Sequence, residues 1–254
     1  MAKRIAGITL ALVMLVASTS FARADYLLYD GSLGTLPGAQ GWLYLTNPLA
    51  GAAATQTAAG GVTILDTTAR TSDMAGYFST GHPLVGTLDR TTGFTVTYQV
   101  KLDSESHNNN DRAGFSIIAL GSDSKGIELG FWQDQVWAQN DSPLFTHGES
   151  AAFSTTAKLT NFALTILGNS YTLRADGVTI LTGAVRDYTA FGPPYTSKNF
   201  LFFGDDTSSA NAKTEIARVT LGIVPEPSSA ALLGCGLVGL ALVARRRRAG
   251  VNVG

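Results

Sequence analysis

Glu128 is the residue whose position in the chain first points to chemistry. It lies in a short apolar run at residues 126–133, two residues before Gly130 and four before Trp132. Side chains alternate along a strand, so these three residues share one sheet face if the run is a strand. A carboxylate beside an aromatic ring can hold a sugar by hydrogen bonding and stacking. Hydrolysis of a glycosidic bond uses two carboxyl groups, and this face of the strand carries one.

Trp137 extends the same face if residues 126–133 and 136–140 form a hairpin. With Asp134 and Gln135 as the turn, Trp132 and Trp137 would stand directly opposite each other. Two interpretations stay open at this point. Glu128, Trp132 and Trp137 can form a ligand-binding surface for a sugar, or the two tryptophans can be an aromatic pair of the core.

Two oxygen-rich stretches offer candidate metal ligands. Asn110 and Asp111 lie in the polar run at residues 107–112, and Asp205 is followed directly by Asp206. Carboxylate and amide oxygens are the ligands that Ca²⁺ takes in proteins, so these four residues are candidates for a structural calcium site. Polar turns have the same composition, and that interpretation also stays open. No other cofactor is expected, and no catalytic residue is assigned from these patterns.

The residues between 25 and 223 form short alternating or β-branched runs separated by Gly, Asn, Asp, Ser and Thr. This pattern predicts an all-β fold, an antiparallel β-sandwich, because no helical segment is available to cross between parallel strands. The predicted strands lie at 26–30, 42–45, 62–66, 75–79, 93–101, 112–120, 126–133, 136–140, 161–167, 170–175, 178–182, 199–204 and 213–221.

Local turn signals add two expectations. Asp176-Gly177 lies between the runs 170–175 and 178–182 and predicts a type I′ hairpin, since both residues tolerate positive φ angles. Residues 50–61 are rich in Ala, Gly and Thr, and we interpret them as a loop inside one domain.

Several segments of this body resemble a known fold family. They are Arg112-Ala-Gly-Phe-Ser-Ile-Ile, Gly126-Ile-Glu-Leu-Gly-Phe-Trp, Val136-Trp-Ala-Gln, Tyr171-Thr-Leu-Arg-Ala-Asp-Gly, Leu181-Thr-Gly, Arg186-Asp-Tyr and Phe200-Leu-Phe-Phe-Gly-Asp-Asp-Thr. Together they resemble concanavalin A-like (laminin G-like) jelly rolls. The resemblance implies a lectin-like sandwich over most of residues 90–222. Jelly rolls of this kind include laminarinase-type hydrolases, which place three carboxylates on alternate positions of one strand. Here Gly130 and Trp132 stand where the second and third would be, which disfavours that route.

The first 24 residues have the composition of a secretory signal peptide. Lys3 and Arg4 precede an apolar run at residues 5–17, and Ala22-Arg23-Ala24 is a small-x-small cleavage site. Signal peptidase would cut after Ala24, so the mature chain is expected to start at Asp25.

The last segment of the chain has three parts in a fixed order. Val224, Pro225, Glu226 and Pro227 end the folded body, an uncharged apolar run follows at residues 230–244, and four arginines close it: Arg245, Arg246, Arg247 and Arg248. The apolar run is near the short limit for a transmembrane helix, and the arginines would stay on the cytoplasmic side. Residues 249–254 are expected to be a disordered tail.

This order resembles the PEP-CTERM sorting signal of exported bacterial proteins. The resemblance covers residues 224–248 and implies recognition by an exosortase, after passage through the general secretion machinery. It also implies an inner-membrane-anchored precursor and a mature protein at the cell surface or in the extracellular matrix. The domain plan is then a signal peptide at 1–24, a sandwich at 25–223 and the sorting signal at 224–248.

The net charge of the body limits the classes of partner that it can bind. Without the two targeting segments, the body has 18 acidic and 11 basic residues, which disfavours nucleic acid and anionic membranes. The single cysteine, Cys235, lies in the tail, so the body has no disulfide. The main prediction is a non-enzymatic structural or glycan-binding protein of the envelope or exopolysaccharide, with polysaccharide as a candidate partner. The alternative is an extracellular carbohydrate-active enzyme with an unrecognised site.

Overall fold

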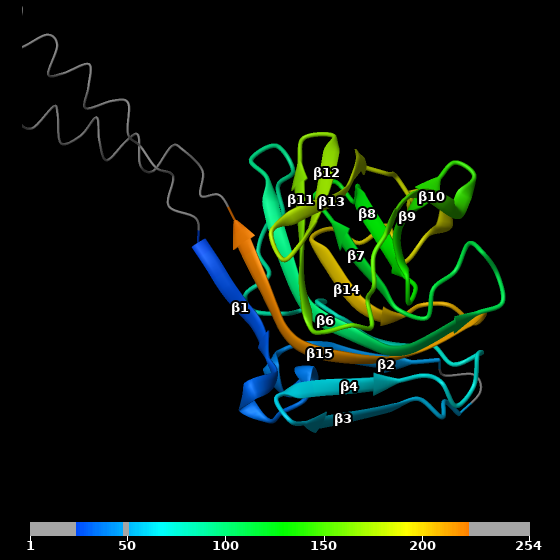
Figure 1. Cartoon of the computed structure of the whole chain (residues 1–254). Helices are drawn as coiled ribbons and strands as arrows, with labels where there is room; N and C mark the ends of the chain where they lie inside the picture. The colour runs from blue at the N-terminus through cyan, green and yellow to red at the C-terminus, as the bar shows by residue number, and fades with distance from the viewer. Residues whose placement is uncertain (1–23, 48–50, 224–254) are drawn as a thin grey trace, which may run out of the picture. The chain divides into compact units, whose positions relative to one another are not determined.

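Residues 24–47 and 51–223 are described by a computed structural model, and they form fifteen strands and three short 3₁₀ helices. The helices are η1 (Gly31–Leu33), η2 (Pro37–Gln40) and η3 (Thr189–Phe191). The strands pair antiparallel in two sheets that face each other as layers (Figure 1). The prediction of an all-β antiparallel sandwich is confirmed.

The eight-stranded sheet has the order β13-β12-β11-β6-β15-β4-β3, and β1 also pairs with β15. Its strands are β1 (Ala24–Asp30), β3 (Thr55–Ala59), β4 (Val62–Asp66), β6 (Phe94–His107), β11 (Thr160–Leu167), β12 (Ser170–Ala175), β13 (Val178–Ala184) and β15 (Ala210–Ile223). The long strands β6 and β15 lie side by side along most of their length (Figure 1).

The seven-stranded sheet has the order β10-β9-β8-β7-β14-β5-β2. Its strands are β2 (Leu43–Thr46), β5 (Ala75–Phe78), β7 (Ser116–Leu120), β8 (Gly126–Phe131), β9 (Gln135–Asp141), β10 (Leu144–Ala152) and β14 (Phe200–Asp205). The candidate site is built on this sheet.

The main core fills the space between the sheets. Alternate residues of each strand point into it, as in β11, where Phe162, Leu164 and Ile166 are buried. The facing strands contribute Ile117, Leu129 and other apolar residues of the seven-stranded sheet. Burial of alternate apolar side chains from both sheets is the main favourable free-energy term of such a sandwich.

A second, smaller apolar cluster lies on the outer face of the seven-stranded sheet. It contains Ile118, Leu120, Tyr188, Tyr195, Phe200 and Phe202. The sheet residues in this cluster alternate with those of the main core, so β7, β8 and β14 are buried on both faces. The segment that supplies Tyr188 and Tyr195 thus shields the middle of this face from water.

The strand predictions are matched in position, with two omissions. Residues 50–61 are not only a loop, because Thr55–Ala59 forms the edge strand β3. Gly60 and Gly61 have φ angles of 62° and 85° and join β3 to β4 as a two-residue turn. The second omission is β10, whose sequence Leu-Phe-Thr-His-Gly-Glu-Ser-Ala-Ala is too polar to signal a strand.

The Asp176-Gly177 hairpin is confirmed. Ala175 pairs with Val178, and the two turn residues have φ angles of 47° and 86°. These are the positive values that a type I′ turn requires.

The predicted signal peptide, apolar tail run and arginine cluster lie outside the described residues. Within residues 24–47 and 51–223, no helix is long and apolar enough to cross a membrane.

Candidate functional site

A cleft of about 500 Å³ lies on the outer face of the seven-stranded sheet. Its lining includes Gln139 of β9, Glu128 of β8, Ile118 of β7, Phe202 of β14 and Leu45 of β2. The cleft therefore runs across the strands rather than along one of them. Its volume is typical of ligand sites in proteins.

Glu128 is buried at this cleft, with 2% of its surface exposed. Its backbone N–H donates to the hydroxyl of Tyr188 over 3.3 Å, and that hydroxyl donates to the carbonyl of Gln139 over 2.7 Å. The Tyr195 hydroxyl donates to Oε2 of Glu128. Tyr188 therefore ties β8 to β9 at this position, and Tyr195 holds the carboxyl group itself.

Asp206, half-buried just after β14, brings a second carboxyl within hydrogen-bonding reach of Glu128. Burial raises the pKa of Glu128 well above its usual range, and the charge of Asp206 raises it further. Burial also raises the pKa of Asp206, to about 6, while its hydrogen bonds with Glu128 and Ser116 oppose that rise. Carboxylates in contact repel each other when both are ionised. Burial and mutual repulsion therefore favour a proton on the pair, and on Glu128 in particular.

Arg112 supplies positive charge at the cleft. Its charge lowers the pKa of Glu128 and of Asp206, as a smaller effect than burial. Its Nη1 donates to the backbone carbonyls of Asp111 and Phe145, each over 2.6 Å. Phe145 has a φ angle of 57°, which is uncommon for a bulky residue. Arg112 thus helps to hold Phe145 in place beside the cleft.

Two further buried carboxyl groups have structural partners. Asp205 accepts hydrogen bonds from the Thr67 hydroxyl over 2.7 Å and from the Thr207 N–H over 3.1 Å. Glu105 is hydrogen-bonded to Nδ1 of His107 over 3.1 Å. Burial raises the pKa of Asp205 and of Glu105. Both groups stabilise strand ends, and the paired Glu128 and Asp206 remain the reactive candidates.

The two predicted tryptophans share the outer face with Glu128, but their pairing differs from the prediction. Trp137 pairs with Gly130, and the turn consists of Gln133 and Asp134, because the N–H of Trp132 donates to the Gln135 carbonyl. Trp132 and Trp137 are therefore diagonal neighbours, with ring centroids 5.7 Å apart. Gly130 leaves room for the Trp137 ring, since a Cβ there would lie 2.7 Å from it.

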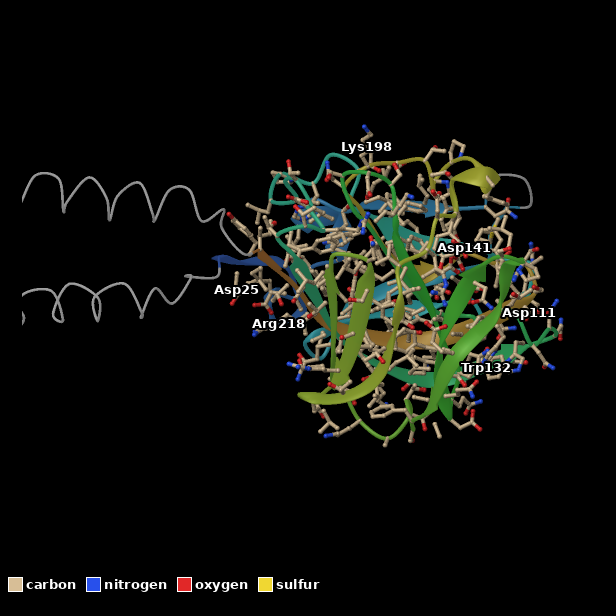
Figure 2. The ribbon with its side chains drawn as sticks, turned by 90° about the horizontal axis from the view of Figure 1, so that it is seen from above. Asp25, Asp111, Trp132, Asp141, Lys198 and Arg218 are labelled. Carbon is tan, nitrogen blue, oxygen red and sulfur yellow. The ribbon has the colours of Figure 1, made fainter. Side chains whose placement is uncertain are left out.

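Histidines cover the tryptophan rings. His107 stacks on Trp132 with centroids 4.1 Å apart and an interplanar angle of 9°, and His147 stacks on Trp137 at 4.3 Å and 10°. Neither tryptophan lines the cleft. Trp132 lies near Asp111 at one end of the sandwich, away from Asp25 and Arg218 (Figure 2). The structure therefore brings Glu128, and not Trp132 or Trp137, to the cleft.

The four candidate calcium ligands take part in separate sets of contacts. Oδ1 of Asp111 accepts from the His147 N–H over 2.7 Å, and the Asn110 carbonyl is hydrogen-bonded to the same histidine. Both oxygens of Asp205 have protein partners, and Asp206 is paired with Glu128. Across the described ranges, no three His, Cys, Asp or Glu side chains are grouped as metal ligands.

Comparison with solved structures gives the fold family. No family model and no curated protein matches the chain. The carbohydrate esterase vb_24B_21 from the Shiga toxin-encoding bacteriophage phi24B is 15% identical with a TM-score of 0.54, over 79% of this chain and 99% of its own. The laminarinase from Rhodothermus marinus is 13% identical with a TM-score of 0.51. The match covers 80% of this chain and 99% of the laminarinase chain. These likenesses show a jelly-roll sandwich.

The comparison corrects the main functional prediction. A non-enzymatic structural or glycan-binding protein was expected, but the neighbours named above are carbohydrate-active enzymes. They agree better with the carbohydrate-active enzyme of the alternative prediction. At 15% and 13% identity these likenesses show the fold, and an assignment of function depends on the residues of the cleft.

Sequence reasoning identified Glu128 but missed its partners. Asp206 was considered only as a calcium ligand, and Gln139, Tyr188 and Tyr195 were not considered as site residues. A signal was present for Asp206, because two consecutive aspartates directly follow an apolar strand. No local signal pairs Asp206 with Glu128, since their contact depends on strand order across the sheet.

Proposed function

We propose that this chain is a carbohydrate-active enzyme that hydrolyses an ester or glycosidic bond of a polysaccharide, with Glu128 as general acid and Asp206 as general base. One observation carries the proposal: the buried Glu128 and the half-buried Asp206 bring two carboxyl groups together at a cleft that crosses the seven-stranded sheet. Groups whose pKa is raised by burial and by a like charge are typical of acid–base sites.

The pair can activate water. A water molecule held against Asp206 can lose a proton to it while attacking the substrate carbon. Glu128 can then give its proton to the leaving oxygen, so that one bond to carbon forms and one breaks. The pair ends with one proton, as it began. General acid–base catalysis of this kind contributes about 10²–10⁴-fold to a rate.

The spacing of the pair favours an ester bond over a glycosidic bond. Glycosidases hold their carboxyl groups about 5–9.5 Å apart, which leaves room for the sugar or for a water molecule between them. Glu128 and Asp206 are in hydrogen-bonding reach, as in carboxyl pairs that add water to a carbonyl. The likeness in fold to a carbohydrate esterase agrees with this candidate.

Product analysis tests the proposal and separates the two bonds. The protein is incubated with polysaccharides that do and do not carry ester substituents. Ester hydrolysis releases a free acid without new reducing ends, whereas glycosidic hydrolysis releases reducing ends. Either product must disappear in Glu128→Gln and in Asp206→Asn. Activity that survives both substitutions would place the chemistry elsewhere.

The proposal includes export and sorting, which the sequence alone supports. Signal peptidase would cut between Ala24 and Asp25, and an exosortase would act at Pro225-Glu226-Pro227. Arg245–Arg248 would hold the precursor in the inner membrane until then. The mature enzyme would act at the cell surface or in the extracellular matrix, where polysaccharide is available.

Mass spectrometry of the two ends of the mature protein tests this part. An N-terminus at Asp25 and a C-terminus near Pro225 are expected. A chain that retains Arg248 after sorting in an exosortase-containing host would contradict the sorting signal.

A further inference from the structure

Phe191 stands out among the residues that line the cleft. Its side chain is 56% exposed, although large apolar side chains are usually buried. It belongs to η3 and lies between Tyr188 and Tyr195, both of which are buried. The N–H of Phe191 donates to the Tyr188 carbonyl over 3.0 Å. The exposed ring is therefore held on a rigid segment.

The neighbouring rings contact Phe191 without stacking flat on it. Phe145 meets it at 5.0 Å with an interplanar angle of 73°, and Tyr195 meets it at 5.7 Å and 88°. Both contacts are edge-to-face, unlike the flat stacking of histidines on Trp132 and Trp137. A ring that is 56% exposed at a cleft can stack against the C–H groups of a sugar ring.

The length of the cleft indicates a chain of sugars. Its lining residues come from β9, β8, β7, β14, β5 and β2, which are consecutive in the sheet. Six strands give five spacings of about 4.8 Å each, or about 24 Å across the sheet. This length exceeds one sugar ring; Leu45 at the β2 end is 47% exposed, and Gln139 at the β9 end is buried.

The charges at the cleft disfavour an anionic polymer. Arg112 is the one Lys or Arg among the lining residues, and its Nη1 is engaged by two backbone carbonyls. The lining also includes three carboxyl groups, from Glu128, Asp205 and Asp206. The body as a whole has more acidic than basic residues. The negative charge of ionised Asp206 and the acidic body would disfavour a polyanion more than a neutral polymer.

We infer that the cleft takes a neutral, linear polysaccharide and that Phe191 stacks against one of its sugar rings. The inference rests on the proposed function, because it names the substrate of the same cleft. Phe191 is then a substrate-binding residue that acts in addition to the Glu128–Asp206 pair.

Affinity electrophoresis tests the inference without turnover. The Glu128→Gln variant of the full chain is run through gels containing laminarin, a neutral polymer, or alginate, a polyanion. We expect retardation by laminarin and none by alginate. Adding Phe191→Ala should weaken the retardation about tenfold in polymer concentration, and Phe191→Trp should preserve it.

Leu167→Ala is the matched control. Leu167 is 55% exposed on β11 of the eight-stranded sheet and does not line the cleft. Its removal should leave retardation unchanged. Stronger retardation by alginate, or equal retardation with and without Phe191, would overturn the inference. Loss of hydrolysis in Glu128→Gln is measured separately, so the proposed function can stand while the inference falls.

Discussion

The outer faces of the two sheets differ in what covers them. On the eight-stranded sheet, strand residues alternate between buried and exposed, and the outer side chains are mostly polar. Thr95 and Thr165 hydrogen-bond across strands there, and Lys101 contacts Asp103 and Glu215. On the seven-stranded sheet, the segment with Tyr188 and Tyr195 adds a second apolar cluster. The same antiparallel architecture therefore carries one solvated face and one desolvated face.

This difference determines how carboxyl groups behave. Asp176, at a turn of the eight-stranded sheet, has its pKa lowered by a hydrogen bond from Lys158. Glu128 has its pKa raised, first of all by burial. Water and a cation stabilise the ionised form in the first case, and their exclusion favours the protonated form in the second. A sheet face becomes suited to acid–base chemistry when a covering segment excludes water from its carboxyl groups.

The largest expected effect is on activity. Glu128→Gln should lower the rate of polysaccharide hydrolysis by about 10²–10⁴-fold, because the amide cannot donate the proton. The matched control is Glu215→Gln on the solvated face, which should leave the rate unchanged. Initial rates at saturating polymer measure both. Equal rates for the two variants would show that Glu128 matters no more to activity than a carboxylate on the solvated face.

Next in size is the effect of removing the Tyr188 hydroxyl. Tyr188→Phe leaves the Glu128 N–H and the Gln139 carbonyl without their buried partner. We expect the free energy of unfolding to fall by about 1–3 kcal/mol. Urea denaturation followed by tryptophan fluorescence measures it. A stability equal to that of the unsubstituted protein would mean that water can replace the hydroxyl, and that the face is less desolvated than described.

The pH dependence of stability gives a smaller, signed effect. The folded state binds the Glu128 proton more tightly than the unfolded state, so the stability of the unsubstituted protein falls as pH rises above the ordinary glutamate pKa. The Glu128→Gln variant has no carboxyl group at this position, so its stability does not fall with pH for this reason. The variant should gain relative stability of about 1 kcal/mol or more between pH 4 and pH 8. Denaturation midpoints at the two pH values test it; a constant difference would contradict the raised pKa.

The smallest effect is expected on the solvated face. Thr165→Val removes one hydroxyl of the pair with Thr95, at 2.8 Å, and the half-buried position of Thr165 accepts an apolar side chain of the same shape. The free energy of unfolding should change by less than about 0.5 kcal/mol. A loss of stability as large as that for Tyr188→Phe would show that removing a hydroxyl costs the same on both faces.

Much of the fold could be predicted because its signals are local. Alternation of apolar residues marked the strands, and Asp176-Gly177 marked a hairpin that the structure confirms. The errors arose where local signals were ambiguous. The turn after β8 lacks a glycine, so the hairpin register was predicted wrongly and Trp132 was placed opposite Trp137 instead of Gly130. β3 was interpreted as a loop because residues 50–61 are rich in Ala and Gly, which are depleted in strands.

The sequence by itself determined the strand pattern, the shared face of Glu128, Gly130 and Trp132, and the targeting predictions for both ends. Each depends on residues close together in the chain. Only the tertiary structure decided that Asp206 meets Glu128, that Tyr188 and Tyr195 cover the outer face, and that histidines cover the tryptophans. These contacts join distant strands, and the pKa of a carboxyl group depends on the water that such contacts exclude.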